Sequence, residues 1–313
     1  MQRILVVAPN WIGDALMAQP LLARLKQSGA SIDVLAPEWV APVVRRMPEI
    51  DQVIAAPFRH GPLQLGERWR LARSLRARRY DQATVLPNTW KSALLPFLAG
   101  IPRRTGYVGE ARYGLLNDLR KAEKAPMAEH YARLAGDTHG ALPAPRLRVA
   151  PAEIEAVRRR FEVQGAYAVF SPGAEYGPAK RWPYFAELAQ RIALPVVVVG
   201  SAGDAPSAHG IPGKNLVGRT TLDEAIALIA GAAAVVSNDS GLMHVAAALQ
   251  RPQVALYGSS SPEHTPPQSA AARVLWLHIE CSPCYQRECP LGHFRCMKEM
   301  NVEMVLDQLK TIS

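Results

Sequence analysis

The chain has 313 residues, of which 49% are hydrophobic and 20% are charged, and its formal net charge is +9. This length suits two domains, and the composition is that of a globular protein, which excludes a disordered chain. Residues 1–150 hold 22 Lys and Arg against 12 Asp and Glu, whereas residues 151–313 hold 14 against 15. The excess positive charge of the first half predicts an anionic partner or membrane surface, although an Arg-rich soluble surface would explain the same count.

The cellular compartment is predicted from two patterns. No apolar run approaches the roughly 20 residues that span a bilayer. Residues 3–8 have a strand pattern and lack the features of a signal peptide. We therefore expect a cytoplasmic protein. Nucleic acid is not an expected partner, because no aromatic-rich RNA-binding pattern or helix-turn-helix is present.

The first half alternates short apolar strands with helices. Strands are expected at 4–8, 32–36, 52–55 and 82–86, helices at 14–27, 39–47, 67–79 and 91–99, and a short edge strand at 103–107. Strands and helices that alternate in this way predict a parallel sheet with helices on both faces.

A Pro- and Gly-rich segment, 136–151, is the predicted linker between a domain at 1–150 and a domain at 151–313. The second half repeats the alternation, with strands expected at 167–171, 195–200, 232–237 and 253–257 and helices at 151–163, 182–191 and 222–231. We expect an α/β protein with two Rossmann-like domains whose parallel sheets face a cleft. Ligands are then expected beyond the carboxyl ends of the strands. The last helix is a candidate to pack back on the first domain.

The loop after the first strand reads Pro9-Asn10-Trp11-Ile12-Gly13-Asp14. It is not Gly-x-Gly-x-x-Gly, so a dinucleotide cofactor is not expected here. Asp14 falls at the predicted N-cap of the next helix and at the mouth of the predicted cleft. It either caps that helix or takes a proton from an attacking hydroxyl as a general base.

Residues 171–183 have the composition of a phosphate-binding loop. Gly173 and Gly177 allow close approach of the backbone, and Lys180 and Arg181 bring positive charge beside a helix start. No Gly-Lys-Ser/Thr ending is present, so this is not a Walker loop. The alternative is that Lys180 is a solvated loop lysine.

A second anion site is predicted at Asn238-Asp239-Ser240, where a strand ends and a small-residue helix begins. Free N–H groups and the macrodipole attract an anion to such a helix start. Asp239 would repel a phosphate above it, so it either faces sugar hydroxyls or only caps the helix. Asp204, after the 195–200 strand, is a weaker candidate for a ribose hydroxyl. Together these loops suit a sugar nucleotide.

The helix at 67–79 is basic and carries Trp69, Ala72 and Leu75 on one side. It is either an ordinary solvated helix with one face on the sheet, which is the favoured alternative, or a surface that lies on anionic headgroups.

All four cysteines, Cys281, Cys284, Cys289 and Cys296, fall within 16 residues, with His293 among them. A structural zinc site, reduced thiols and disulfides are the alternatives for this segment. A catalytic thiol is not expected, because no specific base is identifiable nearby.

These motifs together resemble the ADP-heptose:lipopolysaccharide heptosyltransferases. The resemblance rests on residues 9–14, 171–183, 237–244 and 281–296, and it covers nearly the whole chain in register. Within the family, the segment Glu175-Tyr176-Gly177-Pro178-Ala179 and the cysteine segment favour the heptosyltransferase II group.

The resemblance implies a GT-B fold with the acceptor on the first domain and the sugar nucleotide on the second. It implies an inverting, metal-independent transfer of L-glycero-D-manno-heptose from ADP-heptose to the first heptose of the lipopolysaccharide inner core. The lipid A–inner core acceptor places the protein at the cytoplasmic face of the inner membrane. Heptosyltransferase I, which acts on Kdo-lipid A, a non-catalytic nucleotide-sugar binding protein and a sugar-nucleotide epimerase are the alternatives.

The resemblance also gives roles to residues. Asp14 matches the general base, Lys180 matches the lysine that holds the donor phosphates, and Asp239 matches the aspartate that holds heptose hydroxyls. Ser240, Gly241 and His244 match the turn near the phosphates. Tyr176 and Asp204 complete the predicted donor site, and the predicted acceptor site consists of Asn10, Trp11, Arg59, His60, Lys91, Arg103 and Arg104. No cofactor is required by the family chemistry.

Overall fold

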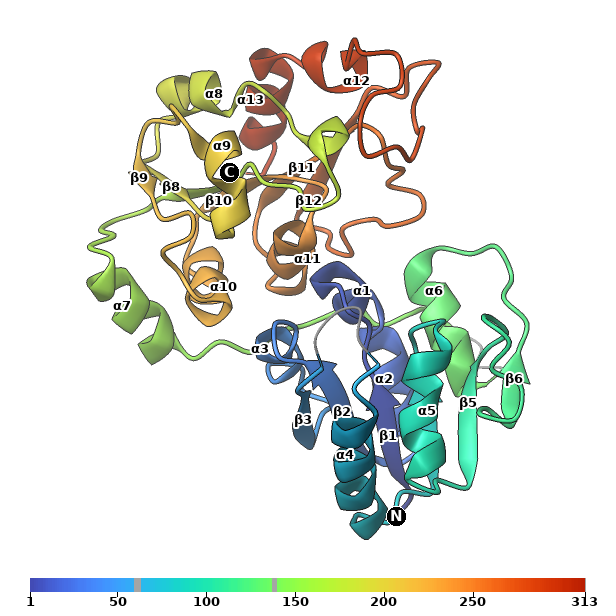
Figure 1. Ribbon diagram of the computed structural model, residues 1–313. Helices are drawn as coiled ribbons and strands as arrows, with labels where there is room; N and C mark the ends of the chain where they lie inside the picture. Colours follow the sequence, from blue (N-terminus) through green and yellow to red (C-terminus); the bar gives the residue numbers. More distant parts are fainter. Residues whose placement is uncertain (59–62, 137–139, 313) are drawn as a thin grey trace. The chain divides into compact units, whose positions relative to one another are not determined.

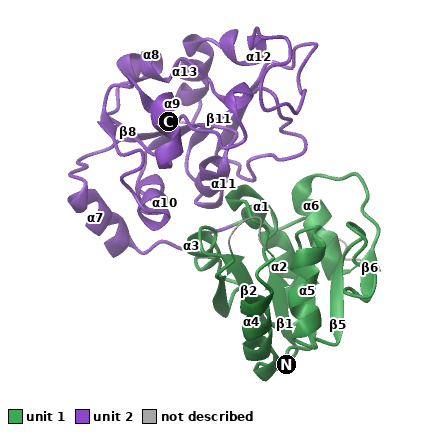
Figure 2. Ribbon diagram, in the orientation of Figure 1, with its two compact units in different colours: residues 1–145 green, residues 146–313 purple. Residues whose placement is uncertain are grey.

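The computed structural model describes residues 1–58, 63–136 and 140–312. The chain forms two compact units, Met1–Pro145 (unit 1) and Arg146–Ser313 (unit 2), shown in Figure 2. The division falls within the Pro- and Gly-rich segment at 136–151. None of the described helices has the length and apolar character needed to cross a membrane.

Unit 1 is built on a six-stranded sheet in which every pairing is parallel (Figure 1). Its strands are β1 (Arg3–Val7), β2 (Ser31–Pro37), β3 (Gln52–Ala56), β4 (Gln82–Val85), β5 (Arg103–Tyr107) and β6 (Asp118–Arg120). Its helices are α1 (Ile12–Met17), α2 (Gln19–Gln27), α3 (Ala41–Val44), α4 (Leu65–Ala77), α5 (Trp90–Leu98), α6 (Met127–Ala132) and η1 (Arg133–Ala135). The order β3-β2-β1-β4-β5-β6 is the Rossmann order, whose switch point lies between β1 and β4.

Helices cover both faces of this sheet, and its central strands β1 and β4 are buried on both faces. Leu5, Val7 and Val85 point to one face, where Leu75 of α4 and Leu95 of α5 pack on them. Residues 4–7 of β1 are all buried. A strand buried on both faces reads as a continuous apolar run, which is why the sequence pattern identified it.

Three predicted elements of unit 1 differ from the structure. The single helix expected at 14–27 is two helices joined at Ala18, because Pro20 stands in the first turn of α2 and cannot continue the hydrogen bonding of α1. The helix expected at 39–47 shortens to α3. The strand at 103–107 is internal, since β5 pairs with both β4 and β6.

Unit 2 repeats the same plan with a second six-stranded parallel sheet in the order β12-β11-β10-β7-β8-β9. Its strands are β7 (Ala168–Ser171), β8 (Val196–Val198), β9 (Lys214–Asn215), β10 (Ala234–Asn238), β11 (Gln253–Tyr257) and β12 (Ala272–Trp276). Its helices are α7 (Pro151–Arg160), η2 (Pro178–Lys180), α8 (Phe185–Arg191), η3 (Ala202–Asp204), α9 (Ala205–Ala208), α10 (Leu222–Ala230), α11 (Gly241–Ala248), α12 (Arg295–Lys298) and α13 (Val302–Lys310). The switch point lies between β7 and β10.

The last helix, α13, belongs to the core of unit 2. Val302, Val305 and Leu309 form its buried face and join the cluster that includes Phe170 and Val198. The apolar face of this helix, a candidate for packing on the first domain, is used within unit 2.

Candidate active site

A pocket of about 460 Å³ lies at the carboxyl edge of the unit 1 sheet. Its walls come from the carboxyl ends of β1, β2 and β3 and from the segments that follow β1 to β5, on both sides of the switch point where ligands of such sheets bind. The side chains that give it its chemistry are Asn10, Trp39, Phe58, Arg68, Trp90, Lys91 and Glu110. Two of the predicted acceptor residues, Asn10 and Lys91, therefore share one pocket.

Two tryptophans form exposed walls of this pocket. Trp39 and Trp90 are 47% and 38% exposed. The Trp39 Nε1–H group donates to the Asn10 carbonyl at 2.9 Å, and the Trp90 backbone N–H donates to Glu110 Oε2 at 3.1 Å. Concave sites with aromatic walls and a few oriented polar groups are typical of small-ligand binding.

Arg68 supplies a buried cation to the same pocket. Its Nε–H donates to the Leu63 carbonyl at 2.7 Å and its Nη1 to the Lys91 carbonyl at 3.0 Å, and its guanidinium lies 4.2 Å from the Phe58 ring centroid. Burial lowers the pKa of Arg68, but a guanidinium stays charged at neutral pH. Within the described part of unit 1, no carboxylate forms an ion pair with Arg68, so its field favours an anionic ligand.

Asp14 lies in the first turn of α1, as the third residue of the helix. The N-cap is Trp11, so the expectation that Asp14 occupies the N-cap position is wrong by three residues. A carboxylate in a first turn is stabilised by the free N–H groups of the helix start. Asp14 is half-buried. Burial raises the pKa of the Tyr131 phenol, and the negative charge of Asp14 is a further cause. Asp14 therefore has a fixed place close to the loop that contains Asn10.

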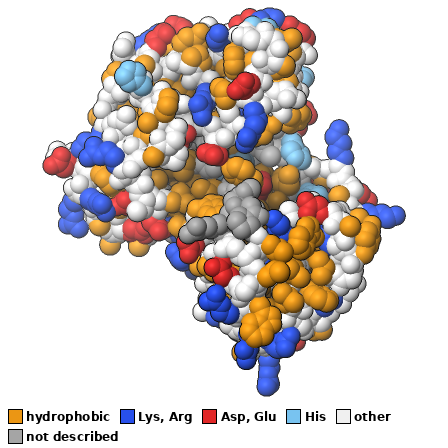
Figure 3. Space-filling view, in the orientation of Figure 1, with side chains coloured by type: hydrophobic (Ala, Val, Ile, Leu, Met, Phe, Trp, Pro, Cys, Tyr) orange, Lys and Arg blue, Asp and Glu red, His pale blue; other side chains and the backbone are white. Residues whose placement is uncertain are grey.

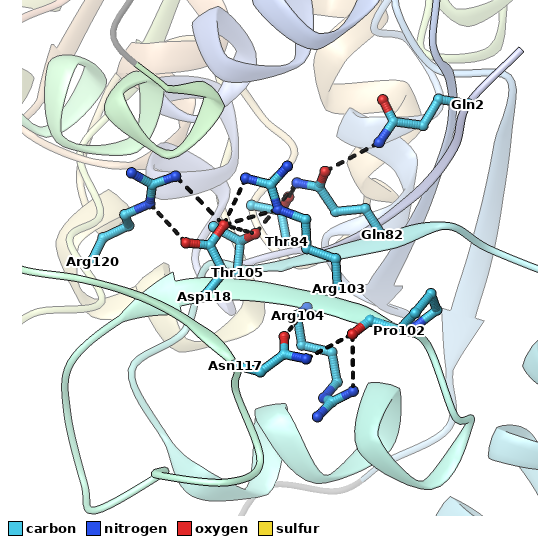
Figure 4. Close-up of polar contacts among 10 residues, drawn as sticks. All are labelled: Gln2, Gln82, Thr84, Pro102, Arg103, Arg104, Thr105, Asn117, Asp118 and Arg120. Carbon is cyan, nitrogen blue, oxygen red and sulfur yellow. Dashed lines mark hydrogen bonds and ion pairs between the residues drawn. The ribbon is translucent and has the colours of Figure 1, made fainter.

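Arg103 and Arg104 lie at the opposite edge of the sheet from the pocket. They begin β5, where Arg103 pairs with Gln82, the first residue of β4. Figure 4 shows Arg103 donating to Asp118 Oδ2 at 2.8 Å, and Arg104 among backbone carbonyls and Asn117. The expectation that these two arginines join the predicted cleft loops is wrong, because a parallel strand presents only its carboxyl end to the switch point.

The other predicted acceptor residues divide into two groups. Trp11 is 54% exposed and stands beside Asn10 at the start of α1. Arg59 and His60 lie outside the described residues.

In unit 2, the predicted donor residues meet at the switch point between β7 and β10. Lys180 Nζ lies 2.5 Å from Asp239 Oδ2, and the same oxygen accepts from Ser260 Oγ at 2.5 Å. The Lys180 and Asp239 side chains are 15% and 6% exposed. The sequence predicted both charged residues but neither their bond nor the role of Ser260, which follows β11.

Asn238 fixes the two loops that carry this pair. Its Nδ2 donates to the Pro172 carbonyl at 2.7 Å, and its Oδ1 accepts from the Trp182 backbone N–H at 3.1 Å. One fully buried side chain thereby holds both ends of the 171–183 loop against β10. The sequence pattern places Asn238 in the predicted anion site and does not indicate this role. The cap is Ser240, and its hydroxyl lies 3.2 Å from Ser237 Oγ.

His244 is buried on α11, one turn after Gly241 begins the helix. Burial lowers the pKa of His244 to about 4, against the opposing influence of Asp239, and Lys180 adds to the lowering. The ring is therefore neutral at physiological pH. Because the His244 ring is neutral, the positive charge at this site comes from Lys180 and from the N–H groups at the start of α11.

Tyr176 connects the donor loop to the cysteine segment. Its ring lies 4.8 Å from Lys180 Nζ, and its hydroxyl donates to the Tyr285 carbonyl at 2.5 Å. At Gly177, with φ +149°, a Cβ atom would stand 2.4 Å from the Arg287 carbonyl oxygen. Only glycine allows the two backbones to approach this closely.

Asp204 is engaged in a local cap. Its Oδ2 accepts from the Ser201 backbone N–H and hydroxyl, both at 2.8 Å, in a capping box that begins η3. A Cβ atom at Gly173 of the donor loop would stand 2.2 Å from Asp204 Oδ1, so only glycine leaves room for this carboxylate. The structure thus places Asp204 beside the donor loop, with one oxygen committed to Ser201.

The four cysteines are free thiols in a loop that packs on the donor turn. Cys289 accepts a hydrogen bond from the Phe294 N–H at 3.4 Å and lies 4.0 Å from His293 Nδ1. Burial, with the other three thiols as further causes, raises the pKa of Cys296 to about 11. Among the described residues, no three His, Cys, Asp or Glu side chains are grouped as a metal site requires.

Comparison with known proteins identifies the family to which the chain is similar. Residues 68–295 match the family model described as glycosyltransferase family 9 (heptosyltransferase). The chain is 44% identical to lipopolysaccharide heptosyltransferase 2 of Escherichia coli K12, across 99% of this chain and 98% of that one, and 41% identical to lipooligosaccharide heptosyltransferase 2 of Haemophilus influenzae, across 99% of each. The solved structure of the E. coli ADP-heptose LPS heptosyltransferase II superposes with a TM-score of 0.89 at 42% identity, covering 100% and 98% of the two chains.

Proposed function

The chain belongs to glycosyltransferase family 9, the heptosyltransferases, and we propose that it transfers a heptose from ADP-heptose to the first heptose of the lipopolysaccharide inner core. It is a glycosyltransferase with the two-unit α/β architecture of the GT-B enzymes. The observation that carries the proposal is that each unit has its own site at the switch point of its sheet. The site of unit 1 is a cationic, aromatic pocket that includes Asn10 of the loop before α1, and the site of unit 2 contains Lys180, Asp239 and the start of α11.

Unit 2 is the proposed donor site. The diphosphate would lie on Lys180 and on the N–H groups at the start of α11, which together supply positive charge. Asp239 accepts hydrogen bonds and would repel a phosphate, so it suits the hydroxyls of the heptose. The Tyr176 ring, 37% exposed, closes one side of the site beside Lys180.

Unit 1 is the proposed acceptor site. The tryptophan walls of the pocket suit the apolar faces of sugar rings, and Arg68 and Lys91 suit the phosphate and carboxylate groups of an inner-core oligosaccharide. Glu110 and Asn10 can orient hydroxyls. Arg68 and Lys91 thus bring two of the basic residues of the first half of the chain to the proposed acceptor site.

The proposed reaction is a direct displacement with inversion. The Asp14 carboxylate takes the proton of the acceptor hydroxyl as its oxygen forms a bond to the anomeric carbon. The bond from that carbon to the diphosphate oxygen breaks, and ADP leaves with the electron pair. Lys180 and the α11 N–H groups stabilise the charge that develops on the leaving group. These groups do what a divalent cation does in other nucleotide-sugar enzymes, so the proposed transfer needs no metal ion.

The location of the acceptor follows from the same proposal. A lipid-linked inner core requires the enzyme to work at a membrane surface, and we propose peripheral association with the cytoplasmic face of the inner membrane. Heptosyltransferase I activity is the alternative, and it differs only in whether the acceptor already carries a heptose.

Replacement of Asp14 tests the chemical role. We expect Asp14→Asn to lower turnover by about 10²- to 10⁴-fold, the usual contribution of a general base. Stabilisation of the variant by ADP, measured by thermal unfolding, should match that of the wild type, because the proposed donor site is in unit 2. Turnover near the wild-type value would remove Asp14 from the role. Equal stabilisation by ADP, UDP and GDP would contradict the proposed nucleotide.

A further inference from the structure

The outer face shared by α4 and α5 carries large apolar side chains in water. Leu65 and Trp69 of α4 are 57% and 54% exposed, and Phe97 of α5 is 44% exposed. Figure 3 shows hydrophobic side chains gathered into a patch over α5, with Lys and Arg side chains nearby. An apolar patch of this kind on a globular protein marks an interaction surface.

The two helices present one continuous surface. They lie side by side in unit 1 (Figure 1), and Arg76 joins them by donating from Nη2 to the Leu98 carbonyl at 2.9 Å. Leu65, Trp69 and Arg73 follow one another at four-residue spacing along α4, so their side chains lie on one side of that helix. We call this surface the α4–α5 face and define it by Leu65, Trp69, Arg70, Arg73, Arg76, Leu94 and Phe97.

Arginines flank the apolar groups of the α4–α5 face. The Arg73 guanidinium lies 4.9 Å from the Trp69 ring centroid, and that of Arg104 lies 5.5 Å from the Phe97 ring centroid. The sequence of α4 contains four arginines and one acidic residue, Glu67, and that of α5 contains one lysine and no acidic residue. The face is therefore positive as well as apolar.

We propose that the α4–α5 face docks unit 1 on an anionic lipid bilayer. Trp69, Leu65 and Phe97 would enter the headgroup region, and Arg70 and Arg73 would pair with lipid phosphates. Tryptophan and arginine side by side are the composition of interfacial membrane anchors. A second copy of the chain fits the α4–α5 face poorly. A symmetric contact would place the arginines of this face against the same arginines of the other copy, and their positive charges would repel.

The α4–α5 face is continuous with the proposed acceptor pocket. Arg68 of α4 and Trp90 of α5 both line the pocket, and the Arg68 Nη1 donates to the Lys91 carbonyl of α5 at 3.0 Å. In this respect the inference rests on the proposed function. A protein that lies on the bilayer by this face has its pocket entrance next to the lipid surface from which the acceptor sugars project.

Vesicle sedimentation tests the proposal with the full chain. We expect the wild type to bind phosphatidylglycerol vesicles, to bind phosphatidylcholine vesicles weakly, and to be released by salt. The Trp69→Ser/Arg73→Gln variant should bind anionic vesicles at least tenfold more weakly, of which about fivefold comes from the arginine. Phe97→Ser provides a second variant on the other helix. Arg159→Gln, which removes an exposed charge from α7 of unit 2, is the matched control and should bind as the wild type does.

Kinetics separate docking from catalysis. With a water-soluble, deacylated acceptor the variants should keep the wild-type kcat/KM, and with the acceptor embedded in anionic vesicles they should lose at least fivefold. Wild-type protein that fails to bind anionic vesicles, or variants that bind them as the wild type does, would overturn the proposal. Dimerisation of the wild type that Trp69→Ser/Arg73→Gln abolishes would also overturn it, in favour of a second copy. Because vesicle binding needs no turnover, it remains informative if the proposed transfer is not observed.

Discussion

Lys180 and Asp239 form an ion pair at the switch point of the unit 2 sheet, with 2.5 Å between Nζ and Oδ2. The pair joins the loop after β7 to the turn after β10, and both side chains are largely buried. The opposite charges of the pair balance one another. In the proposed donor site, the diphosphate would attract Lys180 while the sugar hydroxyls would take its place on Asp239, which would link recognition of the two halves of the donor.

Removal of Lys180 should weaken both folding and donor binding. The Lys180→Ala change leaves a buried carboxylate with Ser260 as a remaining donor, and the loss of one partner of a buried pair costs about 3–5 kcal/mol. We expect a lower unfolding temperature and an ADP Kd at least tenfold higher by calorimetry. In the Lys180→Ala/Asp239→Asn double variant the loss of stability should be smaller than the sum of the single losses. Additive losses would show that the two side chains act independently.

Separate replacements of Lys91 and Arg103 test where the acceptor binds. Lys91 lines the unit 1 pocket, whereas Arg103 is bound to Asp118 at the opposite edge of the sheet. We expect Lys91→Gln to raise the acceptor KM about fivefold or more, the loss of about 1 kcal/mol or more for a charge-assisted hydrogen bond. The donor KM should not change. Arg103→Gln should leave both KM values unchanged, and a raised acceptor KM in that variant alone would place the site elsewhere.

His244 should make folding stability depend on pH in a predictable window. The pKa of His244 is about 4 in the folded protein, because of burial, and about 6.5 when unfolded. Since the unfolded state takes up the proton first, stability falls as pH drops from 6.5 towards 4, by about 2 kcal/mol at pH 5. Urea unfolding of His244→Gln should lack this part of the pH dependence. A variant whose stability falls with pH as steeply as that of the wild type would contradict the assigned pKa.

Chelation should leave transfer intact. In the proposed mechanism, Lys180 and the helix start supply the positive charge that the leaving ADP needs, so exhaustive dialysis against EDTA should change the rate less than twofold. A large loss of rate that a divalent cation restores would contradict this mechanism.

Metal analysis of the same samples addresses the cysteine segment. About one zinc per chain, with a lower unfolding temperature after its removal, would establish a structural site at Cys281, Cys284, Cys289 and Cys296.

The alternation of strands and helices predicted most strands of the two parallel sheets, because a strand buried on both faces is recognisable as a short run of apolar residues. The break between α1 and α2 was missed, although Pro20 was visible, because apolar spacing continues through it. The internal position of β5 was missed because β6, its outer neighbour, has only three residues, all half-buried.

Site residues were predicted where one loop carries the whole signal, as at Lys180 and Asp239. The bond between them joins residues 59 positions apart and depends on strand order, which the sequence pattern does not specify. Asn238 and Ser260 were not assigned roles, because an amide and a hydroxyl become recognisable only through their partners. Arg103 and Arg104 were misplaced although the strand expected at 103–107 begins with them, because the rule that ligands lie beyond the carboxyl ends of strands was not applied to this strand.

The most direct measurement of the proposed function is heptose transfer to two defined acceptors. Purified protein would be incubated with ADP-heptose and with either Kdo-lipid A or the same acceptor already carrying one heptose, and products weighed by mass spectrometry. We expect one added heptose and one ADP released only with the acceptor that carries a heptose, and no product with Asp14→Asn. Efficient transfer to the acceptor without heptose, or transfer to neither, would contradict the function proposed for this chain.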